Sequence, residues 1–256
     1  EKVERDLLRD RDRGSLAARA QTLADFADRY LASRRAEVSA STLDGYRRIV
    51  DRYVKPYIGH LRLEAVDRTA VAGFYSDVLE HGSRRRGIPI EPATVESIHR
   101  VLAMILKRAR EDGLIHRSPC DVVKPPKDDR AREDDEPGID PETARQFLAY
   151  AAGTQVGVVA AVALGTGLRR GELMALRWQD VDMEAGEIDV NGAIEEVGGH
   201  AERKAPKTRR SRRVVPFGPA VADVLRRQRA LLAEKKLQYA KDGAWVDQGW
   251  VFPTQR

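Results

Sequence analysis

Four stretches in the first half of the chain have apolar residues every three or four positions, as one buried face of a helix requires. They predict helices at residues 21–36, 41–54, 69–79 and 92–112, the second ending before Pro56. The apolar stripes are Leu23, Phe26, Ala27, Tyr30 and Leu31; Leu43, Tyr46, Ile49, Val50, Tyr53 and Val54; Val71, Phe74, Tyr75 and Val78; and Val95, Ile98, Val101, Leu102, Ile105 and Leu106. Four amphipathic helices in succession predict a small helical bundle.

The second half mixes helical periodicity with short strand-like runs. Asp140 and Pro141 predict a helix start, because Asp is a favoured N-cap and Pro suits the first turn. Further helices are expected at 158–164, from Arg169 onward and at 219–239. The residues expected to face inward are Ala144, Phe147, Leu148 and Ala151; Val158 to Leu164; Leu173, Met174 and Leu176; and Val221, Val224, Leu225, Leu231 and Leu232.

Strands are predicted at 187–191, 193–197 and 212–217. The first two flank Asn191–Gly192, a dipeptide typical of hairpin turns, and Gly198–Gly199 opens a loop. Together with the helices, these strands predict a mainly α protein with a small β-sheet: an N-terminal helical bundle followed by an α+β domain.

Composition divides the chain into segments. Residues 1–20 are highly charged and are interpreted as a helix linking to an N-terminal domain that is not visible here. Residues 21–120 hold the predicted bundle. Residues 121–139 contain prolines and a run of acidic residues without apolar periodicity, which predicts an extended interdomain linker. Residues 140–256 form the second predicted domain.

The overall composition restricts the functional class. The single cysteine, Cys120, rules out an internal disulfide and suits a reducing compartment. No apolar run is long enough for a membrane span and the N-terminus lacks a signal region, so we expect a cytoplasmic protein. A net charge of +5 and a pI near 9.4 admit nucleic acid as a partner. The aromatic content of 6% argues against a single-strand binder that stacks bases.

The richest segment is G-T-G-L-R-R-G-E-L-M-A-L-R-W-Q-D-V-D, from Gly165 to Asp182. Two glycines interrupt an apolar helix, and an arginine follows at the junction with the next helix. A charge there requires a partner or an anion to bind. The simplest alternative is that Arg169 forms a surface pair with Glu172 three residues later.

This segment resembles the first active-site box of the tyrosine recombinases, the phage integrase family. The resemblance implies that Arg169, in T-G-L-R, is catalytic and that Glu172 supports it. It also implies that the predicted bundle is the family's core-binding domain, of SAM-like fold, and that the second domain is the N-terminal part of a catalytic domain of the DNA breaking–rejoining type.

Residues 203–213, R-K-A-P-K-T-R-R-S-R-R, contain seven basic residues and no acidic residue. One interpretation is a solvated basic loop; the other is the tip of a β-hairpin that lies in a DNA groove. In the family, a catalytic lysine stands on such a hairpin before a V-V-P strand. The resemblance therefore assigns that role to Lys207, with Lys204 three residues away as a competitor.

The resemblance also implies DNA contacts on the polar face of the bundle and along the basic stretch. Each residue taken singly is more simply explained as a solvated side chain, but the basic bias of the group predicts a surface that follows phosphates. The candidates are Thr42, Arg47, Arg48, Arg84, Arg85, Arg86, Thr94, His99, Arg100, Lys107, Arg108, Lys204, Arg209, Arg210 and Arg212.

The family's second box, an H-x-x-R helix followed by a further His or Trp and a nucleophilic tyrosine, should come after V-F-P-T, where this sequence stops. The H-x-x-R strings at His81–Arg84 and His200–Arg203 precede Lys207 and do not fit, and Tyr239 lies before V-F-P-T. The polypeptide shown is therefore expected to lack the nucleophile and to be inactive alone.

The family's chemistry implies an integrase that cuts and rejoins duplex DNA through a 3′-phosphotyrosine, without a metal or other cofactor. A phage or mobile-element enzyme is favoured over a chromosome-dimer resolvase. The expected partners are double-stranded DNA at recombination sites, further copies in a homotetramer on paired sites, and accessory directionality or DNA-bending proteins. Two alternatives are a DNA-binding fragment or decoy without catalysis, and, less favoured, a helical regulator with an unrelated basic hairpin.

Overall fold

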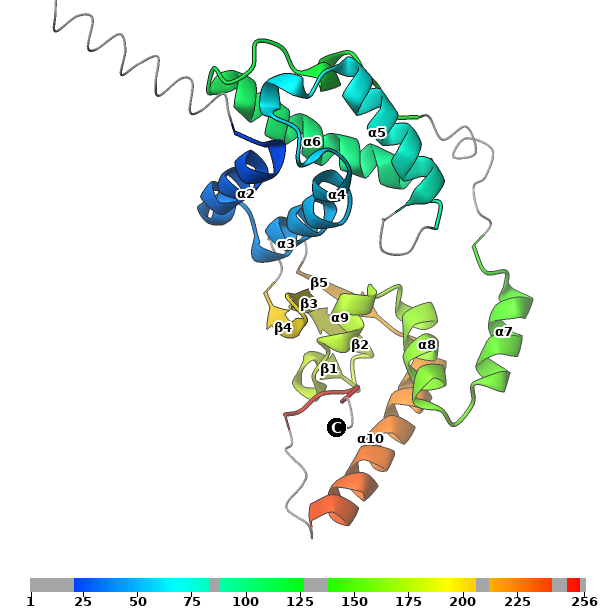
Figure 1. Cartoon of the computed structure of the whole chain (residues 1–256). Coiled ribbons are helices and arrows are strands. Elements are labelled where there is room, and N and C mark those ends of the chain that lie inside the picture. Colours follow the sequence, from blue (N-terminus) through cyan, green and yellow to red (C-terminus); the bar gives the residue numbers. More distant parts are fainter. Residues whose placement is uncertain (1–20, 83–87, 127–137, 206–211, 241–247, 254–256) are drawn as a thin grey trace, which may run out of the picture. The chain divides into compact units, whose positions relative to one another are not determined.

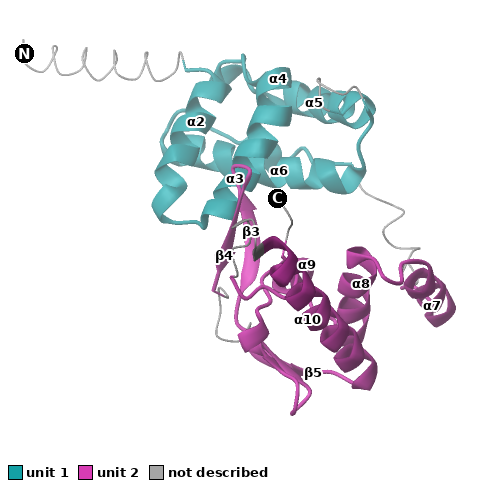
Figure 2. Cartoon of the chain, turned by 90° about the horizontal axis from the view of Figure 1, so that it is seen from below, with its two compact units in different colours: residues 1–135 teal, residues 136–256 magenta. Residues whose placement is uncertain are grey.

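The computed structural model describes residues 21–82, 88–126, 138–205, 212–240 and 248–253. The chain divides into two compact units, residues 1–135 and 136–256, which Figure 2 shows in different colours. Within the described residues, no helix combines the length and apolar character needed to cross a membrane. The charged segment 1–20 and most of the proposed linker lie outside the described residues.

The first unit is a helical bundle (Figure 1). Its helices are α2 (Leu23–Ser33), α3 (Ala40–Ile49), α4 (Lys55–Ile58), α5 (Arg68–His81) and α6 (Pro92–Glu111), with 3-10 turns at Arg34–Ala36, Leu63–Ala65 and Pro119–Asp121. Helix α6 contacts α2, α3 and α5, so it forms the centre of the bundle. The stripes predicted on α2, α5 and α6 are all buried, and the predicted helical bundle is confirmed.

Side chains at the helix starts account for the helix boundaries. Thr22, Ser39 and Asp67 each accept a hydrogen bond from a backbone N–H three residues later, at the beginning of α2, α3 and α5. Pro92 occupies the first turn of α6, where its missing N–H has no cost.

The prediction that the second helix ends before Pro56 is wrong. The helix passes through a π-helical turn at Val50–Val54 and continues into α4. In this turn the N–H of Lys55 donates to the carbonyl of Val50, five residues back. A proline in a helix clashes with the carbonyl four residues earlier, and the wider turn relieves that constraint. Tyr57 and Ile58, just after the proline, therefore join the buried core.

The second unit combines helices with small antiparallel sheets (Figure 1), and the mainly α fold with a small β component is confirmed. Its elements are α7 (Pro141–Tyr150), α8 (Gln155–Thr166), α9 (Arg170–Met174), β1 (Val181–Asp182), β2 (Glu187–Val190), β3 (Ala193–Val197), β4 (His200–Lys204), β5 (Arg213–Pro216) and α10 (Pro219–Ala240). Its core joins α8, α9, β2 and α10 with Val251 and Phe252.

The strand pairing differs from the predicted hairpin at Asn191–Gly192. Among the described strands, β2 pairs with β1 and β5, whereas β3 pairs with β4. Asn191 does not have the positive φ that a hairpin turn of this type needs, so the dipeptide carries the chain from one sheet to the other. The tight turn is instead at Gly198–Gly199, where both φ angles are positive. The basic stretch follows β4 and precedes β5, which belong to different sheets, so it does not join two paired strands.

Helix α8 is less covered than its sequence predicts. Its apolar residues lie on all sides, which is typical of a fully buried helix. In the structure α10 packs along one side, and Leu164 remains 49% exposed. An open apolar groove runs between α7, α8 and α10. For the same reason the inward positions predicted at Phe147 and Leu231 are wrong: both side chains are 42% exposed.

Candidate active site

Arg169 stands at a sharp junction between two helices. Gly167 ends α8 in the left-handed conformation, with φ of 64°, and its N–H donates to the carbonyl of Ala163. The sequence pattern predicts that Gly165 also interrupts the helix, and this is wrong: Gly165 lies within α8. Arg169 then has extended backbone angles and serves as the N-cap residue of α9.

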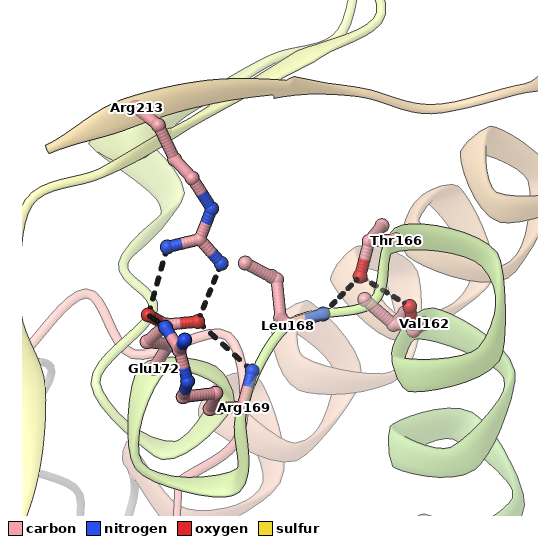
Figure 3. A network of polar contacts seen from close by, with 6 residues as sticks. All are labelled: Val162, Thr166, Leu168, Arg169, Glu172 and Arg213. Carbon is pink, nitrogen blue, oxygen red and sulfur yellow. Dashed lines mark hydrogen bonds and ion pairs between the residues drawn. The ribbon is translucent and has the colours of Figure 1, made fainter. Parts of the chain in front are cut away.

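Glu172 holds this junction from inside (Figure 3). The residue is 9% exposed, and its carboxylate accepts the backbone N–H of Arg169 at 2.9 Å. The same carboxylate accepts a hydrogen bond from Arg169 Nη1 at 3.2 Å. The simple i,i+3 pair is therefore present, but one member is a buried carboxylate that also fixes the backbone of the other.

A second arginine, Arg213 on β5, completes the network from 41 residues away. Its Nη1 donates to Glu172 Oε1 at 2.9 Å and its Nη2 donates to Oε2 at 2.8 Å, which is the parallel fork that a carboxylate fits best. These bonds lower the pKa of Glu172 to about 2, against the opposing effect of burial, with a further contribution from the Arg169 amide. Glu172 is therefore a permanent anion at neutral pH.

The guanidinium of Arg169 is left open to solvent. Its side chain is 78% exposed, while that of Glu172 is 9% exposed. The arginine backbone is thus fixed and the charged head is available to an external anion. A planar fork of N–H donors with a charge that does not titrate suits the non-bridging oxygens of a phosphodiester.

A separate network anchors the other end of α9. Arg203 on β4 donates from Nε to the carbonyl of Ala175 at 3.1 Å and from Nη2 to the side chain of Asn191. Asn191 donates to buried Asp180 at 2.8 Å, and Asp180 also accepts the backbone N–H of Arg177 at 3.2 Å. The sequence string His200–Arg203 therefore supplies a structural arginine, which holds the strands to the end of α9.

The basic stretch is only partly described. Lys204 lies 3.7 Å from Glu195 and 3.9 Å from Glu202, so its charge is balanced within the strands. Arg212 is exposed. Lys207, Arg209 and Arg210 lie outside the described residues, and their roles stay predictions.

The DNA-contact candidates of the bundle fall on two helices. Thr42, Arg47 and Arg48 belong to α3, and Thr94, His99, Arg100, Lys107 and Arg108 belong to α6. Arg84, Arg85 and Arg86 lie outside the described residues. The helices α3 and α6 contact each other, but the candidates do not share one face.

Several candidates already have partners inside the bundle. Thr42 is half-buried, with its hydroxyl 2.8 Å from that of Ser39, and His99 Nδ1 lies 2.6 Å from the hydroxyl of Tyr75. Arg108 lies 2.9 Å from Asp112. Arg100 and Lys107 are exposed and seven residues apart, so they share the face of α6 opposite its buried stripe. Lys107 Nζ lies 3.9 Å from Glu111, whereas Arg100 donates to the neutral hydroxyl of Ser97. Arg100 is therefore the best candidate phosphate contact among the described residues of the bundle.

Sequence reasoning missed Arg213, Arg203, Asn191 and Asp180 as members of the site. In the sequence, Arg213 is distinguished only as the last residue of the basic stretch 203–213. No sequence spacing links these residues to Arg169, because strand pairing brings them there. The sequence offers one indication of these contacts, which is residue type. A carboxylate such as Asp180 requires a partner if the fold buries it.

The comparisons with known proteins identify the family of the chain. A model of the phage integrase family matches residues 139–255, and a model of the phage integrase N-terminal SAM-like domain matches residues 22–78. A tyrosine recombinase XerC-like protein of Caldanaerobacter subterraneus subsp. tengcongensis is 25% identical over 76% of this chain and 51% of its own length. The ICEBs1 integrase of Bacillus subtilis is 25% identical over 94% of this chain and 64% of its own length.

Solved structures show the same fold. The Tn1549 transposon integrase in complex with a circular intermediate DNA superposes with a TM-score of 0.69 at 20% identity, covering 92% of this chain and 72% of that one. A lambda integrase dimer bound to a core site gives a TM-score of 0.62 at 14% identity, covering 93% and 59%. The chain belongs to the phage integrase, or tyrosine recombinase, family, and it spans about half to two thirds of the length of the curated relatives named above.

Proposed function

We propose that the protein is a site-specific DNA recombinase of the integrase type, which cleaves and rejoins duplex DNA through a 3′-phosphotyrosine and integrates or excises a phage or mobile element. The observation that carries this proposal is Arg169: its backbone is fixed by buried Glu172, and its guanidinium is open to solvent. Relatives named integrase and tyrosine recombinase support the same reaction class.

In the proposed reaction, a tyrosine oxygen attacks the scissile phosphorus while the 5′-oxygen of the next nucleotide leaves. The phosphodiester energy is kept in the protein–phosphate bond, and attack by a 5′-hydroxyl reverses the step. Arg169 binds the non-bridging oxygens, whose charge increases in the transition state. Lys207 gives a proton to the departing 5′-oxygen. This role is given to Lys207 and not Lys204 because Lys204 is paired with Glu195 and Glu202.

None of these steps uses a metal ion or another cofactor. Tyr239 on α10 precedes the V-F-P-T string and is not assigned as the nucleophile. The proposed partner is double-stranded DNA at recombination sites, with four copies on paired sites, and a lambda integrase tetramer bound to a Holliday junction among the similar structures supports that assembly for the fold. We further propose that accessory directionality or DNA-bending proteins take part in the reaction and that the protein acts at the bacterial nucleoid.

The test is a covalent trapping assay. The protein, expressed from its complete coding sequence, is mixed with a nicked suicide duplex that carries candidate sites and is run on a denaturing gel. A shifted band that is lost in Arg169→Ala, and retained in Arg226→Ala on the exposed face of α10, supports the proposal. Peptide mapping of the adduct identifies the tyrosine. Specific binding in a native gel without any adduct would instead show a DNA-binding protein that occupies sites without cutting them.

A further inference from the structure

We infer that Arg213 is a positioning residue for the active site: it holds Glu172 in place and thereby leaves the guanidinium of Arg169 free for the scissile phosphate. The inference rests on the proposed function for its catalytic consequence, but the contacts are visible in the structure itself (Figure 3). The resemblance gives roles to Arg169, Glu172 and Lys207 and none to Arg213.

The first step of the argument is geometric. Both Glu172 oxygens accept from Arg213, and each also accepts one hydrogen bond from Arg169, from Nη1 to Oε1 and from the backbone N–H to Oε2. A carboxylate held by a bidentate fork cannot rotate about its terminal bond without breaking both bonds. The fork thereby fixes the oxygen that caps the N–H of Arg169. Since Arg213 is on β5, it also ties this junction to the sheet.

The second step concerns charge. Glu172 is a nearly buried anion and requires a cation. If Arg213 were absent, Arg169 would be the nearest cation in the network and would turn its fork fully onto the carboxylate. With Arg213 present, Arg169 makes one side-chain bond of 3.2 Å to Glu172 and its side chain stays 78% exposed. Arg213 therefore competes with Arg169 for Glu172, and this competition keeps Arg169 available to DNA.

The third step explains why the residue is an arginine. Its side chain is 33% exposed and spans from a strand to a buried carboxylate, where two parallel N–H donors meet two oxygens. A lysine in its place would keep the positive charge but lose the second directed bond. Arg213→Lys therefore separates positioning from net charge, which Arg213→Ala would not do.

The experiment compares four variants in the trapping assay: Arg213→Lys, Glu172→Gln, the double variant, and Arg226→Lys as a matched control in an exposed pair with Asp223. The adduct rate is measured in single turnover at saturating DNA, and the Kd is measured by native gel. We expect Arg213→Lys to slow adduct formation about 10- to 100-fold, because displacement of a catalytic group by about 1 Å costs that much. We expect its Kd to stay within about twofold, since Arg213 is turned toward Glu172 and not toward solvent.

The double variant distinguishes positioning from a direct role. If Arg213 acts through Glu172, Arg213→Lys adds little to the loss already caused by Glu172→Gln. Multiplied losses would mean that Arg213 reaches the DNA itself, and would overturn the inference. If Arg213→Lys folds poorly, Glu172→Gln alone tests whether the contact between Arg213 and Glu172 matters. This variant keeps the shape of the Glu172 side chain and leaves Arg213 in place.

A second measurement decides the inference without catalysis. Hydrogen exchange by NMR reports the backbone N–H of Arg169, which donates to Glu172. We expect this amide to exchange about tenfold faster in Arg213→Lys and to be unchanged in Arg226→Lys. An amide unaffected by Arg213→Lys, or a variant that forms adducts at the normal rate, overturns the inference. If no protein forms an adduct, the proposed reaction fails, while the amide still tests whether Arg213 positions Arg169.

Discussion

Gly165 of α8 lies directly against Val221 of α10. A Cβ atom at position 165 would be 2.3 Å from Cγ2 of Val221, closer than any real non-bonded contact allows. The glycine therefore lets the two helices approach, and the core formed by Val162, Val221 and Leu225 depends on this approach. The box that carries Arg169 begins at this crossing.

Gly165→Ala is expected to destabilise the second unit by about 1–3 kcal/mol, because the added methyl group overpacks a helix crossing. Denaturant unfolding followed by tryptophan fluorescence measures this unit alone, since the three tryptophans, at 178, 245 and 250, all fall within residues 136–256. Combining the change with Val221→Ala should recover part of the loss. The control is Gly73→Ala, at an open position inside α5 of the first unit; because that unit has no tryptophan, its unfolding is followed by circular dichroism. This change should be neutral or stabilising by up to about 1 kcal/mol, so an equal loss there would contradict the packing explanation.

Much of the bundle could be predicted because its helices follow one rule. The stripes of α2, α5 and α6 are buried as their spacing requires, since each helix has a single neighbouring core to face. The prediction that the helix ends before Pro56 failed because a π-helical turn can accommodate a proline, and the spacing of apolar residues does not indicate that turn. The inward positions expected at Phe147 and Leu231 failed because burial depends on which neighbour covers a face, and periodicity does not supply that neighbour.

Only the local part of the site was accessible from sequence. Arg169 and Glu172 are three residues apart, and their spacing on a helix start predicts contact. Arg213 meets Glu172 because β5 pairs with β2, and Arg203 meets Ala175 because β4 pairs with β3. The predicted hairpin at Asn191–Gly192 would have placed these arginines differently. Register and sheet order are long-range properties, so the partners of the box had to come from the structure.

The pKa of Glu172 predicts a specific loss of stability in acid. The carboxyl has a pKa of about 2 in the folded protein and an ordinary value of 4.5, so the unfolded chain binds a proton first as pH falls. The contribution is complete above pH 4.5, declines below it and is lost by pH 2; the depression corresponds to roughly 3 kcal/mol. Glu172→Gln should remove this pH dependence and lower stability at pH 7.

The check is the denaturation midpoint of the second unit, followed by tryptophan fluorescence at a series of pH values from neutral down to pH 2. Glu234→Gln, at an exposed position on α10, is the matched control and should keep the wild-type profile. An acid profile that is the same in Glu172→Gln and wild type would mean that other carboxyl groups dominate.

His99 predicts a second pH effect, confined to the bundle. Burial lowers the pKa of His99 below its ordinary value of 6.5, and nearby Lys124 lowers it further. The unfolded chain therefore binds a proton at higher pH than the folded one, and the stability of the bundle should fall as pH drops below about 6.5. Protonation would also put an N–H on Nδ1, which lies 2.6 Å from the hydroxyl of Tyr75.

NMR titration of the His99 ring should give a pKa below 6.5, and amide exchange in α5 and α6 should quicken on acidification. His99→Asn, whose side-chain oxygen can take the place of Nδ1, should make exchange less sensitive to pH. His60→Gln changes an exposed histidine of the same unit and is the control. A His99 pKa at or above 6.5 would contradict this account of its environment.

The exposed face of α6 gives the most direct test of the proposed contact between the bundle and DNA. Each lysine or arginine that neutralises a phosphate contributes about 0.9 to the slope of log affinity against log salt concentration. Arg100 donates to the neutral hydroxyl of Ser97, so its charge is available, whereas Arg110 on the same helix lies 2.9 Å from Asp121. Arg100→Gln should lower the slope by about 1 and weaken binding alike on specific and random duplexes. Lys107→Gln should lower the slope by less, because Lys107 Nζ lies 3.9 Å from Glu111. Arg110→Gln should change the slope much less, because its charge is already balanced. Equal effects from all three variants would show that DNA responds to the net charge of the bundle and not to this face of α6.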